Sequence, residues 1–110
     1  MLVRIFLGEG ERWHRASLVT ALVERLRREG YAGATVIRGI EGFGAKNVLH
    51  AAHHLRLSEE LPVLIEVVDT EERAEKLLPI LDEMVTEGLV TMEPVRVVRY
   101  LPSREPAPAS

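Results

Sequence analysis

Hydrophobic residues occur along this chain in short runs separated by longer amphipathic stretches. Residues 2–7 (LVRIFL) are rich in branched and aromatic side chains and are followed by Gly8, which predicts a buried strand that ends in a turn. Residues 34–40 (ATVIRGI), 62–68 (PVLIEVV) and 95–100 (VRVVRY) have the same composition. The pattern therefore predicts four strands.

Two of the stretches between these runs have the periodicity of helices. Residues 17–29 repeat leucine and valine at helical spacing and end in basic residues before Gly30, which is typical of a helix C-terminus. Asp69 and Glu72 form a capping-box pattern at the start of a second apolar repeat, and Gly88 is expected to end that helix. The order is therefore strand, helix, strand, strand, helix, strand.

This order predicts an α+β fold. Two strand–helix–strand halves form the split βαβ arrangement of a ferredoxin-like sandwich, with a four-stranded antiparallel sheet and both helices on one face. Residues 1–101 are expected to make one domain. Residues 102–110 contain three of the six prolines and are expected to form a disordered C-terminal tail.

The run from Val63 to Val68 is apolar on both faces of the predicted strand, and only Glu66 interrupts it. A sheet covered by helices on one face alone should alternate apolar and polar residues. Other subunits are therefore expected to cover the second face, which favours a homo-oligomer over a monomer.

Composition and charge narrow the function classes. The 110 residues include no cysteine, so disulfides, thiolate nucleophiles and cysteine-bound metals are excluded, and a cytoplasmic location is expected. Lys and Arg number 14 against 17 Asp and Glu, and they are scattered, which argues against a nucleic-acid partner. No secretion signal or membrane span is expected, so no direct insertion into a membrane is predicted.

The most informative segment for chemistry is residues 38–46 (RGIEGFGAK), at the end of the second predicted strand. Glycine allows close backbone approach, so backbone amides can point at an anion while cationic side chains supply charge. The spacing matches neither the phosphate loop of nucleoside triphosphatases nor the dinucleotide fingerprint, and a bulge and turn that let the chain leave the sheet remain the alternative. The candidate ligand-binding residues are Arg38, Gly39, Gly42, Phe43, Gly44 and Lys46.

Residues 43–61 form a connection longer than is usual inside a compact domain, and a mobile, partly helical loop is predicted there. His50, His53 and His54 would place two imidazoles on one face if this segment is helical. A metal site is thus an alternative, although no aligned carboxylate accompanies them. A solvated polar segment is the simpler interpretation.

Three segments carry a resemblance to a known family: RGIEGFGAKNVLH, LRLSEELPVLIEVVDTEE and LDEMVTEGLVTMEPVRVVRY. Over residues 2–101 the chain resembles the family known as domain of unknown function 190. That family is similar to PII signalling proteins, which are ferredoxin-like trimers that bind adenine nucleotides between subunits and present a long mobile loop to target proteins. Where PII proteins continue Gly-Phe-Gly with Arg-Gln, this chain has Ala45-Lys46.

The resemblance implies a homotrimeric, non-enzymatic regulator in signal transduction that binds a small anionic ligand, with an adenine nucleotide as one candidate. It implies a membrane-transport protein as a partner, because members of the family are often encoded beside a small fluoride-channel protein. It identifies no cofactor. A trimeric divalent-metal-binding protein that uses the loop histidines is the alternative function. An enzyme ranks last, since the sequence shows no paired acid and base at a convincing spacing and no serine in a nucleophile motif.

Overall fold

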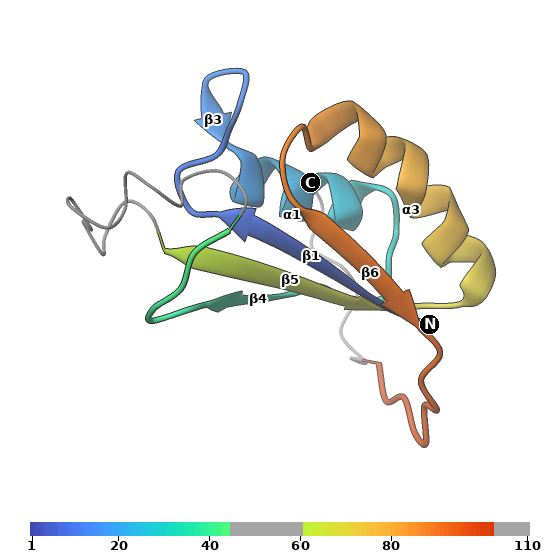
Figure 1. The fold of residues 1–110 in the computed structure, drawn as a ribbon. Coiled ribbons are helices and arrows are strands. Elements are labelled where there is room, and N and C mark those ends of the chain that lie inside the picture. The colour runs from blue at the N-terminus through green and yellow to red at the C-terminus, as the bar shows by residue number, and fades with distance from the viewer. Residues whose placement is uncertain (45–60, 103–110) are drawn as a thin grey trace.

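The computed structural model describes residues 1–44 and 61–102. A four-stranded sheet has the order β4 (Thr35–Arg38), β5 (Pro62–Val68), β1 (Leu2–Gly8) and β6 (Leu89–Glu93), and every neighbouring pair is antiparallel. Helices α1 (Leu18–Arg28) and α3 (Glu71–Met84) lie together on one face of it (Figure 1). The ferredoxin-like α+β prediction is confirmed.

The core lies between the sheet and the two helices. Alternate residues of β1 and β5 point toward the helices and are buried, as the period of two in a strand requires. From the sheet these residues are Val3, Ile5, Leu7, Val63, Ile65 and Val67, and from the helices they include Leu18, Leu22, Leu26, Leu77 and Leu81. Neither α1, with 11 residues, nor α3, with 14, could cross a membrane, and no other helix occurs among the described residues.

Helix α1 is one residue shorter at each end than the predicted range 17–29, because Ser17 and Glu29 are its capping residues. The Ser17 hydroxyl accepts a hydrogen bond from the Thr20 amide at its N-terminus, as a capping serine does. At the C-terminus the Gly30 amide donates to the Arg27 carbonyl and the Tyr31 amide donates to the Leu26 carbonyl. This Schellman arrangement requires a left-handed residue, and Gly30 has φ +81°.

The N-terminal cap of α3 is one residue later than predicted. Thr70, not Asp69, caps the helix, and its hydroxyl accepts from the Arg73 amide at 3.2 Å. The Asp69 carboxylate instead accepts hydrogen bonds from the amides of Ala32 and Thr70. The helix ends at Met84, before the predicted stop at Gly88.

The prediction of the last strand was wrong. β6 is Leu89–Glu93, and residues 95–100 belong to no strand. Pairing with β1 runs from Phe6–Leu89 to Leu2–Glu93, and the next residue is Pro94, which has no backbone N–H to donate. Residues 95–100 have strand composition but lie beyond the end of this ladder.

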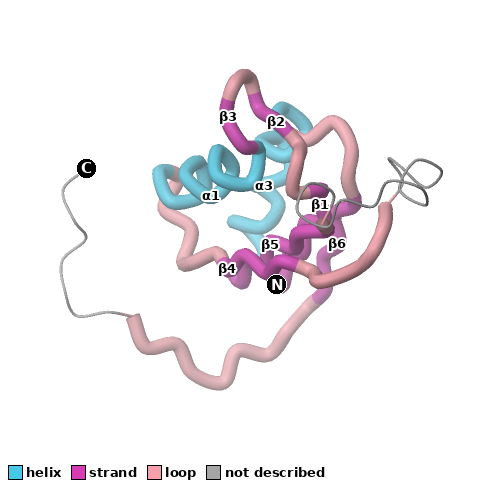
Figure 2. Tube along the Cα trace, turned by 90° about the vertical axis from the view of Figure 1, so that its left-hand side faces the viewer, coloured by secondary structure: helices cyan, strands magenta, loops and turns pink. Residues whose placement is uncertain are grey.

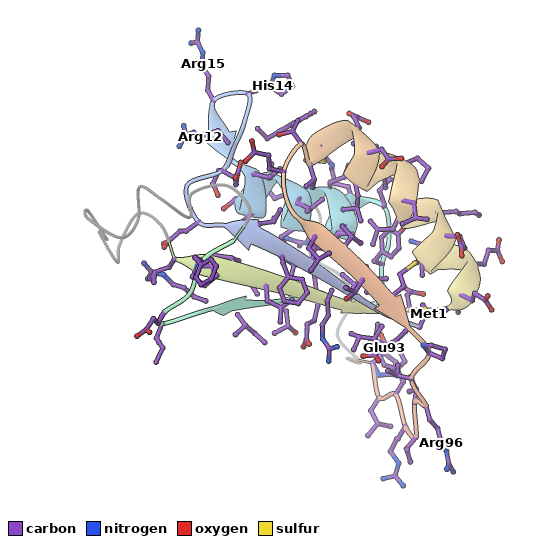
Figure 3. The ribbon with its side chains drawn as sticks, viewed as in Figure 1. Met1, Arg12, His14, Arg15, Glu93 and Arg96 are labelled. Carbon is purple, nitrogen blue, oxygen red and sulfur yellow. The ribbon has the colours of Figure 1, made fainter. Side chains whose placement is uncertain are left out.

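A short hairpin before α1 was not predicted. Strands β2 (Arg12–Trp13) and β3 (Ala16–Ser17) pair with each other and project beyond the sheet (Figure 2). The Trp13 ring packs against the core, and the His14 ring meets it edge-on at 4.4 Å between centroids. His14 itself is exposed and points outward (Figure 3).

Candidate anion site at the base of the β4–β5 connection

The predicted ligand-binding segment begins where β4 ends, at Arg38. The Gly39 amide donates to the Pro62 carbonyl at 2.7 Å, and the Glu9 amide donates to the Leu61 carbonyl at 2.9 Å. The chain therefore leaves the sheet after β4 and returns before β5 at one corner, beside the end of β1. We refer to residues 9, 38–44, 61 and 62 as the connection base.

Arg38, the predicted cation, has an acidic partner that sequence reasoning missed. Its Nε lies 3.2 Å and its Nη2 lies 2.8 Å from the two carboxylate oxygens of Glu9. The two residues are 29 positions apart, so no local motif links them. This fork-like pair is partly open to solvent, with the Arg38 side chain about half exposed.

The three glycines of the segment have different roles. A Cβ at position 39 would lie 2.7 Å from Pro62 Cγ, and a Cβ at position 42 would lie 3.1 Å from the same atom. Gly39 and Gly42 are thus explained by close packing against Pro62, which supports the alternative of a turn that lets the chain leave the sheet. A Cβ at Gly44 would have no heavy atom within 4 Å, so packing does not require this glycine.

The outer part of the connection base is open to solvent. Ile40 and Phe43 are 89% and 77% exposed, and Gly44 is exposed as well. Within residues 1–44 and 61–102, the amides of residues 40–44 make no hydrogen bond. An anion approaching from solvent would meet one guanidinium here and several amides that have no partner in the part of the chain that the structure describes.

Several predicted site residues cannot be placed beside this corner. Lys46 and the three histidines at positions 50, 53 and 54 lie outside the described residues, as does most of the predicted mobile loop, 45–60, and the tail from residue 103. Among the residues that are described, no group of three or more histidine or acidic side chains could hold a metal ion.

The sheet face opposite the helices carries an apolar row beside the connection base. Cross-strand pairing aligns one residue from each strand in the order β4, β5, β1, β6. These residues, which we name the open-face row, are Ile37, Leu64, Phe6 and Leu89. All four are exposed or half-buried, which agrees with the two-sided apolarity predicted for β5.

The next row on the same face is polar. Arg4 lies between Glu66 at 3.0 Å and Glu93 at 2.8 Å. The hydrogen bond that Arg4 donates to the Glu66 carboxylate, together with the negative charge of Glu93, raises the pKa of the Arg4 guanidinium above its ordinary value. The open face therefore has an apolar part and a charged part, in which one guanidinium lies between two carboxylates.

These features define a small ferredoxin-like α+β protein with an exposed glycine segment at one corner of its sheet. The chain belongs to the DUF190 family, described as "Uncharacterized ACR, COG1993", whose model matches residues 1–97. It is 36% identical over 99 residues to the UPF0166 protein MJ1524 of Methanocaldococcus jannaschii, covering 89% of this chain and 91% of that one. A UPF0166 protein of Aquifex aeolicus is 34% identical over 99 residues, covering 88% and 91%.

Proposed function

We propose that this protein is a PII-like regulator that acts in the cytoplasm and has no enzymatic activity. It binds a small anionic ligand at the connection base, between subunits of a homotrimer, and presents the β4–β5 connection to a partner protein. An adenine nucleotide is the first candidate ligand, and a membrane-transport protein is the candidate partner. The observation that carries the proposal is the Arg38–Glu9 pair beside the amides of residues 40–44, which have no hydrogen-bond partner among the described residues.

The geometry suggests how ligand binding would be coupled to the connection. A phosphate group competes with the Glu9 carboxylate for Arg38, since both are acceptors that match the guanidinium fork. The Glu9 amide donates to the Leu61 carbonyl and the Gly39 amide donates to the Pro62 carbonyl. Hydrogen bonds therefore fix both ends of the connection next to the Arg38–Glu9 ion pair. A ligand that binds one state of this corner more tightly would shift the connection toward that state.

The open-face row supports the subunit arrangement. Four apolar side chains in a continuous row across a sheet form a surface that is usually covered by another chain. A second and third copy would cover it. Covering the row would place a neighbouring subunit beside the connection base, because Ile37 is adjacent to Arg38.

Calorimetry with substituted chains tests the ligand site. Thermal shift first identifies the ligand among adenine nucleotides, cyclic nucleotides and divalent metals, since a ligand at 100 times its Kd stabilises by about 2.7 kcal/mol. Lys46→Ala should then weaken the binding of an anion by about 1.5–3 kcal/mol, which is a ten-fold or greater loss of affinity. Gly44→Val should also weaken binding by blocking close approach, yet alter stability by less than about 0.5 kcal/mol, since the position has free space.

Gly39→Ala is the contrasting variant, because its Cβ would collide with Pro62 and it should lower stability. If the affinity of a nucleotide is the same after Lys46→Ala and after Gly44→Val, that nucleotide binds elsewhere. If only divalent metals raise the melting temperature, the alternative of a metal-binding trimer that uses His50, His53 and His54 replaces this proposal.

A further inference from the structure

Residues 95–101, which we name the C-terminal arm, extend away from the folded body. The arm follows β6 and leaves on the side of the sheet opposite the helices (Figures 1 and 2). Its backbone makes no hydrogen bond to any described residue. Val98 and Leu101 are 83% and 78% exposed, and Arg96 points away from the sheet (Figure 3).

The composition of the arm is that of a strand that lacks a neighbour. Its sequence, VRVVRYL, is dominated by branched and aromatic residues, which favour strands. Val97 and Val98 are adjacent, so an extended arm presents an apolar side chain on each of its two faces. An arm of this kind gains most from pairing with a strand that is apolar on both faces.

β4 is such a strand, and no strand among residues 1–44 and 61–102 pairs with its outer edge. It is the terminal strand of the sheet, and Val36 and Ile37, also adjacent, are 44% and 45% exposed on opposite faces. It contains no proline and no lysine, two of the devices that protect exposed edges. The β4 edge and the arm are therefore suited to pair with each other, since each presents apolar side chains on both faces.

We propose that the C-terminal arm of one copy pairs with the outer edge of β4 in a second copy, extending that copy's sheet to five strands. Main-chain hydrogen bonds satisfy the free backbone groups of both segments. Val97 and Val98 continue the apolar rows that pass through Val36 and Ile37 on the two faces.

The same arm cannot pair fully with β4 of its own chain. It begins beside β6, and β4 lies at the opposite edge, three strand intervals away. Reaching the position outside β4 takes one interval more, about 19 Å in all at ~4.8 Å per interval, which uses roughly six of the arm's residues at ~3.3 Å each. Too few residues would remain to form a ladder. An exchange between copies leaves the whole arm available.

This inference rests only on the assembly part of the proposed function and requires no ligand. Because the chain has no cysteine, introduced cysteines can be crosslinked without background. Thr35→Cys marks the β4 edge, and Val97→Cys or Val98→Cys marks one or the other face of the arm. The edge variant is co-expressed with each arm variant and oxidised, and the products are separated on a denaturing gel.

The mixed sample should contain a band at twice the 12.3 kDa mass of the chain, absent when either variant is oxidised alone. Thr91→Cys on β6, the other edge of the sheet, is the matched control and should give none. The inference is overturned if the Thr35 mixtures give no such band while light scattering shows an oligomer, or if Thr91 crosslinks equally. Either result would leave the ligand site to be decided by calorimetry.

Discussion

At the scale of single residues, the ion pair of Arg38 with Glu9 matters most for the proposed function. It is short and fork-like, yet both side chains reach solvent, and exposed ion pairs contribute only about 0.2–1 kcal/mol. A ligand can therefore displace Glu9 at small cost. In the proposed function, Glu9 would therefore compete with the anion for Arg38 and lower the affinity of the site.

Glu9→Gln should strengthen anion binding. The substitution removes the competing charge and frees Arg38, so calorimetry should find affinity raised by up to about five-fold, the equivalent of a ~1 kcal/mol exposed pair. Glu41→Gln is the matched control, because it makes the same charge change in the same segment without contacting Arg38. Equal effects of the two substitutions would mean that the ion pair is not involved.

At the scale of elements, the end of α1 is tied to the start of α3. The Tyr31 hydroxyl donates to the Arg73 carbonyl at 2.9 Å, and the Arg73 guanidinium lies over the Tyr31 ring, 4.3 Å from its centroid. Arg73 also donates to the Glu29 carbonyl, and the Asp69 carboxylate accepts from the Ala32 amide at 2.9 Å. These contacts hold the two helices side by side on the sheet.

Tyr31→Phe should lower the free energy of unfolding by about 1 kcal/mol, the usual value of one hydrogen bond. Burial raises the pKa of Tyr31 above its ordinary value of 10.0. The fold therefore favours the neutral phenol, and this stabilisation is complete below about pH 10 and lost as pH rises through the higher folded pKa.

Urea denaturation at pH 8 and at pH 11 measures both effects. The wild-type chain should lose more stability than Tyr31→Phe between these two values. Tyr100→Phe is the control, because Tyr100 is exposed and makes no hydrogen bond within the described residues. An equal loss in wild type and Tyr31→Phe would contradict the role given to Tyr31.

At the scale of the whole molecule, the described residues show one covered and one uncovered face of the sheet. The helices bury the inner residues of β1 and β5, whereas the open-face row stays accessible. The proposed roles of the arm and of the connection base both require other copies of this chain. The proposed assembly would therefore connect the candidate site to the uncovered face of the sheet.

Phe6→Lys should dissociate the proposed trimer. Phe6 is central in the open-face row and 38% exposed in the single chain, so a lysine can be accommodated there but is costly inside an interface. Light scattering should show a shift from an oligomer toward the 12.3 kDa chain. Phe6→Leu, which keeps the site apolar, should retain the oligomer. A wild-type protein that is monomeric at micromolar concentration would contradict the assembly outright.

Local sequence was sufficient for most of the secondary structure. The β5 strand at residues 62–68 and the Ser17 and Gly30 ends of α1 were predicted, because branched apolar runs and capping residues act over a few positions. The order of these elements was enough to specify a ferredoxin-like sheet. The glycine segment after β4 was also visible as a candidate site.

Tertiary structure decided what depends on partners distant in the chain. Residues 95–100 have better strand composition than Leu89–Glu93, yet the latter pair with β1, because Pro94 interrupts the ladder and the register with Phe6 begins at Leu89. Thr70 rather than Asp69 caps α3, and the Asp69 carboxylate accepts a hydrogen bond from the amide of Ala32, 37 positions away. Folding brings the ends of β1, β4 and β5 to one corner. Only there does Glu9 pair with Arg38, and only there does Pro62 leave no room for a Cβ at Gly39. Sequence patterns determined the local conformations, whereas competition among distant hydrogen-bonding and packing partners determined which of them were used.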